Sequence, residues 1–412
     1  MGRFDLFPIF IAIFASRRVT LIATHSKSQK QTRLPIRYLY FILPFKPLIN
    51  KEVIKVFQNY SNNRIVFLDW LRVIACFMVM VVHSSECVYS NDYSFSFPSE
   101  LGRWSVCLIN GFVRPAVPLF LIASAYLLIP LRTDTKTFFR KRFMRVVIPF
   151  VIWLFMYAVL PGLWGEFSNE EVKNNLSHIF INFIPRASHL WFIYMLLGIY
   201  LIMPVLSPWL ERVSRREEEV FLGIWLFTTL FWHAHEIFGD VFGECWWNPY
   251  PLFYYVSGYV GYVVMAHYIR KYLDWSTKKT LYIALPCFLV GYLFCIGSFY
   301  TRSFTVEEVR QLELSWQTTS IAPVLMSFGA FMLIRKITCA RARIYKAICD
   351  VSAMSYGMYL MHMLILPYVF GICNPVMSPP LAIFATAIIT YVVCYIIAKL
   401  ISLFKFGKYI VG

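Results

Sequence analysis

The chain has 412 residues, of which 59% are hydrophobic, 18% aromatic and 15% charged. Soluble domains are about 45–50% apolar and about 25% charged, so this composition excludes an ordinary soluble protein and favours one whose solvent is lipid. The net charge of +17 does not indicate nucleic acid binding, because the basic residues stand in short blocks between apolar runs, where they set topology and contact anionic headgroups.

Residues 1–63 do not fit the pattern of the rest of the chain. The apolar stretch Leu6–Ala15 is too short to span a bilayer and lacks a convincing signal-peptide cleavage site. The stretch from His25 to Arg64 is polar and basic. We interpret residues 1–63 as a basic cytoplasmic arm or a wrongly assigned start, and residues 64–408 as one membrane domain.

From residue 66 onward, apolar runs of about 20 residues follow one another, which is the length that crosses a bilayer as a helix. The sequence therefore predicts an all-α membrane protein, a bundle of about ten transmembrane helices. The fifth run is the weakest, because it is short and ends in Trp232-His233-Ala234-His235. The runs are 66–88, 105–130, 143–163, 190–208, 219–235, 250–268, 280–299, 316–334, 352–372 and 380–404.

The loops between these runs predict the orientation. Basic residues gather in the even-numbered loops and in the C-terminal tail, whereas the odd-numbered loops hold only Arg103, Lys173, Arg186, Arg302 and Arg310. By the positive-inside rule, both termini are expected in the cytoplasm. The odd-numbered, outer loops are rich in acidic residues, which we interpret mostly as a solvated face.

Four ionisable residues lie in or beside the first span, where each carries a cost and invites a functional hypothesis. Arg72 and His83 are eleven residues apart, which places them on one helix face about 16 Å apart. Asp69 precedes Arg72 by three residues, as a structural ion pair or a functional partner. Two readings are open for His83: a core histidine that bonds a neighbour, or a group that moves a proton. Two are also open for Glu86: it orients the imidazole of His83, or it is an exposed charge at the end of the helix.

Here the sequence resembles a known family, the acyltransferase 3 membrane acyltransferases. Five segments in the expected order, within residues 64–404, carry the resemblance. They are Leu68-Asp69-Trp70-Leu71-Arg72 with His83, Arg114–Leu127 with Pro118 and Ser124-Ala125-Tyr126, Phe139–Pro149 with Arg142 and Arg145, His189–Tyr194 with Trp191, and Ser355–His362.

The likeness is to the stand-alone branch that includes the enterobacterial common antigen O-acetyltransferase. Two features depart from or limit the pattern. The second helix reads Ser124-Ala125-Tyr126 where the family has Ser-Gly-Tyr or Ser-Gly-Phe, and no SGNH-type hydrolase domain follows the tenth run.

The resemblance implies a reaction and its partners. An acyl group, expected to be acetyl, would pass from cytoplasmic acyl-CoA to a hydroxyl of a cell-surface or lipid-linked glycan at the bacterial inner membrane. His83 would be the catalytic residue and Arg72 its partner, while Arg142 and Arg145 would bind the phosphates of acyl-CoA. Two guanidinium groups three residues apart also suit phosphate on physical grounds.

The remaining candidates have less support. Arg114, His189 and Trp191 line the acceptor side or anchor the chain at the membrane interface. Ser124 and Tyr126 belong to the substrate-binding set that the resemblance implies. His362 lines the acyl path or packs within the bundle.

Two other functions are compatible with the sequence. A glycan transporter or flippase would share the helices and buried charges. An inactive partner in a glycan-assembly complex is a third reading, against which Arg72 and His83 both argue.

His233, His235 and Glu236 lie close together in the sequence, but no third ligand is placed, so no metal site is expected. Acyl length, the acceptor and the oligomeric state are left open.

Overall fold

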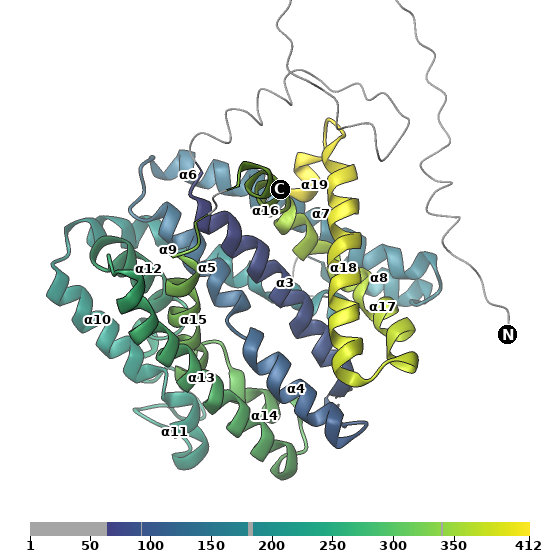
Figure 1. Ribbon diagram of the computed structural model, residues 1–412, viewed down its shortest axis with the longest axis horizontal. Helices are drawn as coiled ribbons and strands as arrows, with labels where there is room; N and C mark the ends of the chain where they lie inside the picture. The colour runs from purple at the N-terminus through teal and green to yellow at the C-terminus, as the bar shows by residue number, and fades with distance from the viewer. Residues whose placement is uncertain (1–63, 92, 180–183, 339–340) are drawn as a thin grey trace, which may run out of the picture. The chain divides into compact units, whose positions relative to one another are not determined.

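The computed structural model describes residues 64–412 apart from 92, 180–183 and 339–340, so the prediction for residues 1–63 lies outside the described residues. Most of the described chain is helical (Figure 1). The first half comprises α3 (Val66–Tyr89), α4 (Glu100–Val113), α5 (Ala116–Leu128), α6 (Thr135–Arg142), η1 (Phe143–Val147), α7 (Ile148–Leu163), α8 (Asn169–His178), η2 (Pro185–Leu190), α9 (Trp191–Arg212), α10 (Arg215–Thr228) and α11 (Phe231–Phe238).

The second half of the described chain continues in the same way. It comprises η3 (Tyr254–Val256), α12 (Val260–Tyr272), α13 (Thr277–Thr305), α14 (Val309–Glu313), η4 (Leu314–Trp316), α15 (Ile321–Ile334), α16 (Ala342–Met361), η5 (His362–Leu364), α17 (Leu366–Cys373), η6 (Asn374–Val376), α18 (Pro379–Ser402) and α19 (Lys408–Val411).

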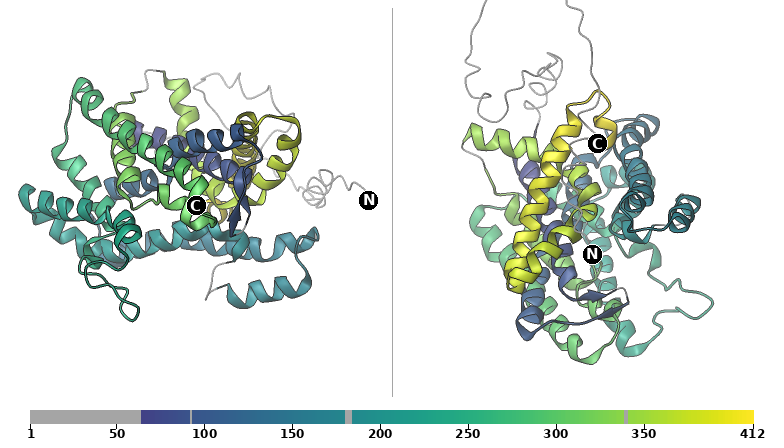
Figure 2. Two further views of the ribbon diagram at one scale, coloured as in Figure 1. Left: turned by 90° about the horizontal axis from the view of Figure 1, so that it is seen from below. Right: turned by 90° about the vertical axis from the view of Figure 1, so that its right-hand side faces the viewer.

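One small hairpin interrupts the helices. Strands β1 (Ser90–Asn91) and β2 (Ser94–Phe95) pair antiparallel, with Ser90 opposite Phe95, and are drawn as dark blue arrows in Figure 2. The hairpin is tied to the start of α14, because the backbone N–H of Val309 donates to the carbonyl of Tyr93 at 3.1 Å. It therefore joins the end of α3 to the α14 region.

Six helical segments are long and apolar enough to cross a membrane: Val66–Tyr89, Glu100–Leu128, Thr135–Leu163, Pro185–Arg212, Thr277–Thr305 and Pro379–Ser402. Two bent pairs raise the number to eight if each is one span. They are Val309–Trp316 with Ile321–Ile334, bent by 43°, and Arg343–Leu364 with Leu366–Val376, bent by 60°. The protein is a multi-pass, all-α membrane protein.

Eight of the ten predicted spans overlap these segments. The other two, 219–235 and 250–268, fall on α10, α11 and α12, which are shorter than the membrane-crossing helices. The chain turns at Thr229 and Leu230, between α10 and α11, instead of continuing as one helix. The count of ten and the cytoplasmic position of the termini stay predictions.

The first span, α3, is central to the packing. It contacts α4, α5, α16 and α18, and Figure 1 shows it between α5 and α18. It begins on the side of α6 and α19 and ends on the side of α11 and α14. The residues along α3 are thus surrounded by helices from both halves of the chain, which allows its polar side chains to meet partners far away in sequence.

The closest helix pair, α13 and α15, depends on glycine. A Cβ at Gly329 would lie 2.4 Å from the carbonyl oxygen of Ala284, and one at Gly291 would lie 2.5 Å from that of Ala322. Both distances are shorter than van der Waals contact, so only glycine permits this approach. Small residues at such contacts are a common means of packing helices in lipid.

Candidate functional site

The end of α3 carries a chain of three ionisable side chains. The carboxylate of Glu86 lies 2.7 Å from Nδ1 of His83 and 3.3 Å from a terminal nitrogen of Arg114, which follows α4. The Arg114 guanidinium also covers the ring of Trp316 at 4.1 Å. Because a carboxylate only accepts hydrogen bonds, Nδ1 of His83 carries a hydrogen, and in the neutral imidazole Nε2 then has the lone pair. This arrangement orients His83 as a base, with Arg114 offsetting the charge of Glu86.

Two further histidines surround His83. The ring centroid of His362 is 5.1 Å from that of His83, and the ring of His189 is 6.3 Å away. His189 and His362 are themselves 4.8 Å apart. They come from η2 and η5, so three segments of the chain bring their imidazoles together. We call His83, His189 and His362 the histidine cluster.

Hydrogen bonds fix which nitrogen of each buried histidine is protonated. Nδ1 of His362 lies 2.6 Å from the carbonyl oxygen of Tyr359 and must donate to it. The hydroxyl of Tyr157 donates to the carbonyl of Leu360 at 3.0 Å, so it accepts from Nε2 of His189 at 3.4 Å. The hydroxyl of Tyr359 in turn donates to the carbonyl of His189. These bonds lock the two rings in place.

The same bonds leave one ring nitrogen on each histidine for another molecule. Nδ1 of His189 and Nε2 of His362 are buried without a hydrogen-bond partner among the described residues. Buried polar atoms are nearly always paired in native proteins, so unpaired ones need an explanation such as a substrate or a water. Two such atoms, on rings whose centroids lie 5.1 and 6.3 Å from that of His83, mark a site that can bind polar groups and move protons.

A second carboxylate lies near this cluster. The hydroxyl of Tyr89 donates to Glu313 at 2.6 Å, and Glu313 is close enough to Glu86, Arg114 and His83 to act on their charges. From the sequence, Glu313 belongs to the acidic outer loops, and none of its sequence neighbours indicates that it lies near the site. Tyr157 lies within an apolar span and has no sequence signal for a role at the site either. Tyr359 had a signal, because it lies three residues before His362 and so shares its helix face.

Toward the start of α3, Asp69 is the hub of a separate network. It is 2% exposed, accepts from Ser352 at 2.7 Å and lies 3.6 Å from Arg72 and 3.5 Å from Arg64. Tyr345 also donates to it, at 3.3 Å. Asp69 therefore ties α3 to α16, which is the structural reading of the predicted pair. Its partner Arg72 remains about one third exposed.

The two arginines that are predicted to bind the phosphates of acyl-CoA, Arg142 and Arg145, lie in the same region. Arg145 and Tyr200 are close enough to Arg72 to act on its charge. Arg142, at the end of α6, is half-buried with its guanidinium 5.7 Å from the ring of Tyr200, and Arg145 is exposed on the π-helical turn η1. Ser124 shares a hydrogen bond of 3.1 Å with Tyr200. Arg72, Arg142 and Arg145 are thus gathered around Tyr200, away from the histidine cluster.

Two other predicted site residues are placed differently. Tyr126 lies beneath two arginines, with the guanidinium groups of Arg270 and Arg335 at 5.7 and 5.9 Å from its ring. Trp191 is 42% exposed and its ring is 6.2 Å from Tyr259. Trp191 is thus directed away from the histidine cluster, which favours the interface-anchor reading for this residue.

Within one multi-pass bundle, the structure thus holds a histidine oriented by a carboxylate near the end of α3 and a group of arginines near its start. The family of the acyltransferase domain (acyltransferase 3) matches residues 65–399. The chain therefore belongs to the acyltransferase 3 family and is a membrane acyltransferase. No curated protein and no solved structure matched the chain.

Proposed function

We propose that this protein is an O-acetyltransferase of the bacterial inner membrane, which moves an acetyl group from cytoplasmic acetyl-CoA to a hydroxyl of a cell-surface or lipid-linked glycan. The observation that carries the proposal is the geometry of the histidine cluster. His83 is held through Nδ1 by Glu86, and its free Nε2 is accompanied by the unpaired nitrogens of His189 and His362. Activation of a hydroxyl needs such a base.

The donor would bind at the other end of α3. Phosphate groups of acetyl-CoA pair with Arg142 and Arg145, whose planar guanidinium groups match phosphate oxygens. Arg72 lies next on the way to His83, about 16 Å along the helix. The thioester end of acetyl-CoA therefore has to reach past Arg72 toward His83 while the phosphates stay bound at Arg142 and Arg145.

Two routes account for the transfer. In the direct route, Nε2 of His83 takes the proton of the acceptor hydroxyl, whose oxygen bonds to the thioester carbonyl carbon. The carbon–sulfur bond breaks, and the proton passes to the sulfur so that CoA leaves as the thiol. In the relay route, Nε2 itself bonds to the carbonyl carbon, the carbon–sulfur bond breaks and CoA leaves as the thiolate. The acceptor oxygen then bonds to the same carbon as its bond to Nε2 breaks, and the hydroxyl proton is released to solvent, where the thiolate takes up a proton. His189 and His362 bind the acceptor or hold the protons in either route.

The test uses full-length protein in membrane vesicles that carry the host's own glycans, supplied with radiolabelled acetyl-CoA. We expect thiol release together with ester-linked label in the glycan fraction. His83→Ala should lower both by at least about 10²–10⁴-fold, the usual contribution of a general base. His178→Ala, which changes an exposed histidine of α8, is the matched control and should keep full activity.

The outcomes separate the proposal from its rivals. A glycan transporter or flippase would release no thiol from acetyl-CoA. Full activity of His83→Ala, with normal amounts of the variant in the membrane, would remove the proposed mechanism. One equivalent of thiol released in acceptor-free detergent would favour the relay route over direct transfer.

A further inference from the structure

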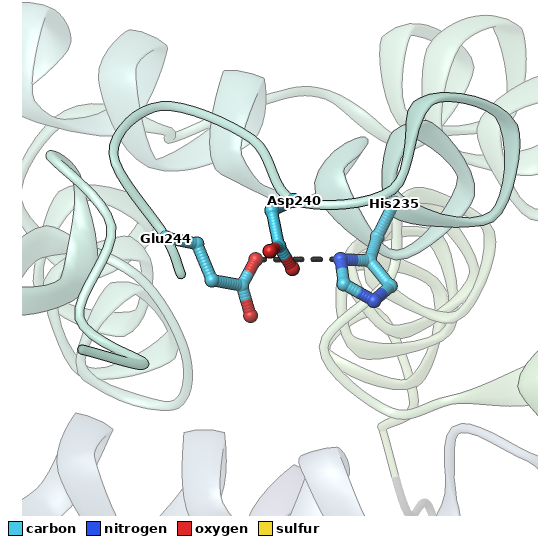
Figure 3. A group of neighbouring side chains, drawn as sticks. All are labelled: His235, Asp240 and Glu244. Atoms are coloured by element: carbon cyan, nitrogen blue, oxygen red, sulfur yellow. Dashed lines mark ion pairs between the residues drawn. The ribbon is translucent and has the colours of Figure 1, made fainter. Parts of the chain in front are cut away.

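A second group of ionisable side chains lies where α11 ends and the loop to α12 begins, on segments that carry no member of the histidine cluster. His235 is in the last turn of α11, and Asp240 and Glu244 follow in the loop. One ligand atom from each lies within 4.8 Å of the others, and Nδ1 of His235 is 3.3 Å from a carboxylate oxygen of Glu244. Figure 3 shows the three side chains directed toward a common point.

The backbone of this loop is bent so that the two carboxylates face the histidine. Gly239, Phe242 and Gly243 have φ values of +73°, +53° and +90°. Phe242 is a bulky side chain in the left-handed region, which is rare and needs support from its surroundings. Its ring is stacked on Phe231 at 4.9 Å and touches Phe253 at 5.5 Å. The aromatic contacts therefore hold the segment between Asp240 and Glu244 in a fixed shape.

The charges of the group are unbalanced. Two carboxylates converge, yet within the described ranges Asp240 has no ion pair, and the ion pair of Glu244 is with His235. The neighbouring basic residue, Arg302, pairs with Glu236 instead. A divalent cation between the carboxylates would remove their repulsion.

We propose that His235, Asp240 and Glu244 bind a divalent transition-metal cation of the Zn²⁺ or Mn²⁺ type. One imidazole and two carboxylates are ligands that suit these ions, whereas Ca²⁺ takes oxygen ligands. Ligands about 2.1 Å from a tetrahedral ion are about 3.4 Å apart. The His235–Glu244 distance of 3.3 Å already has this value, and the ligand atom of Asp240 lies within 4.8 Å of both, so small side-chain movements complete the set and water fills the remaining position.

The cation would fix a loop that carries an exposed aromatic surface. Trp246 is 92% exposed and Trp247 is 69% exposed, and both directly follow the metal-binding segment. Tryptophan is enriched where a protein meets the membrane–water interface. Cation binding at His235 thus orders the segment that presents Trp246 and Trp247, independently of the acyl-transfer site.

The test measures metal directly. Purified full-length protein, stripped with a chelator and titrated with Zn²⁺ or Mn²⁺ in detergent, should bind one equivalent by calorimetry and by elemental analysis, and Ca²⁺ should bind far more weakly. His235→Ala and Glu244→Gln should weaken binding at least about tenfold, since loss of an outer partner alone costs about 10–100-fold. Metal should also slow hydrogen exchange in residues 239–253 of the unmodified protein.

His233→Ala is the matched control, because His233 lies two residues away and faces Glu236 at 3.9 Å instead of the site. It should bind metal as the unmodified chain does. Less than about a tenth of an equivalent bound by the unmodified protein, or equal affinity in His235→Ala, would overturn the proposal. Elution volume and melting temperature of each variant show whether it is folded, so a misfolded variant is recognised and replaced by Asp240→Asn.

Discussion

At the scale of single residues, the candidate site consists of side chains that three distant segments of the chain bring together around His83. Helical spacing predicts that Arg72 and His83 share one face of α3. It could not show that His83 meets His189 and His362, because contacts between distant segments follow from tertiary packing and not from period. Trp191 lies two residues after His189, where the 3-10 helix η2 passes into α9, and it is 42% exposed whereas His189 is buried.

Glu86 gives the first prediction at this scale. Replacing Glu86 by Gln removes the charge that favours Nδ1–H on His83 and allows the amide to donate, which selects the wrong tautomer. We expect kcat for thiol release from acetyl-CoA to fall by about 10²–10⁴-fold, the range for loss of general-base function. Kinetics on membrane vesicles at matched protein amounts measures the change.

The control for this prediction is Glu100→Gln. Glu100 also pairs with an arginine, Arg103, at 3.3 Å, but it is more than half exposed and lies at the start of α4. Its loss should leave kcat unchanged. Equal kcat for Glu86→Gln and the unmodified protein would show that Glu86 does not orient His83.

At the scale of helices, eight predicted spans coincide with long apolar segments, and the other two, 219–235 and 250–268, fall on shorter helices that pair through buried polar side chains. Glu218 lies just before the predicted run 219–235, within the charged stretch Arg215-Arg216-Glu217-Glu218-Glu219, which by itself indicates exposure to solvent. In the structure it is fully buried, 2.8 Å from Nδ1 of His267. Such pairing between α10 and α12 leaves no mark in a single sequence, since the two residues are 49 positions apart.

The Glu218–His267 pair gives the second prediction. His267→Ala leaves the Glu218 carboxylate buried without its partner, which typically costs about 3–5 kcal/mol. We expect a clear drop in the melting temperature of purified protein in detergent. The double variant Glu218→Met with His267→Met should recover most of it, because replacing both partners by apolar groups is often neutral.

His178→Ala again serves as control and should melt like the unmodified protein. A double variant that melts as low as His267→Ala would mean that the helices need the polar pair itself. Packing beside the pair is already tight, because a Cβ at Gly261 would lie 2.0 Å from the ring of Trp225. The region around α10 and α12 therefore tolerates little change in volume.

At the scale of the whole membrane domain, two groups of residues with different chemistry lie near the two ends of α3. One has Arg72, Arg142 and Arg145, and the other has the histidine cluster. Composition and the order of motifs predicted a membrane acyltransferase, and the family match agrees. The 60° bend between Arg343–Leu364 and Leu366–Val376, which comes directly after His362, was not predictable, because hydropathy reports the length of a span and not its break.

This separation predicts that the arginines act on donor binding and not on the chemical step. Arg142→Ala and Arg145→Ala each remove a charge-assisted hydrogen bond, worth about 1.5–3 kcal/mol, so KM for acetyl-CoA should rise by about 10–100-fold while kcat changes little. Arg→Lys at either position keeps the charge but loses the planar fork, so its KM for acetyl-CoA should lie between those of the unmodified protein and the alanine variant.

Lys141→Ala is the matched control, since Lys141 is exposed, adjacent in sequence and equally charged. If Lys141→Ala raised KM as much, the arginines would contribute only general surface charge, and acetyl-CoA would have to be recognised elsewhere, for example by Arg270 and Arg335 around Tyr126.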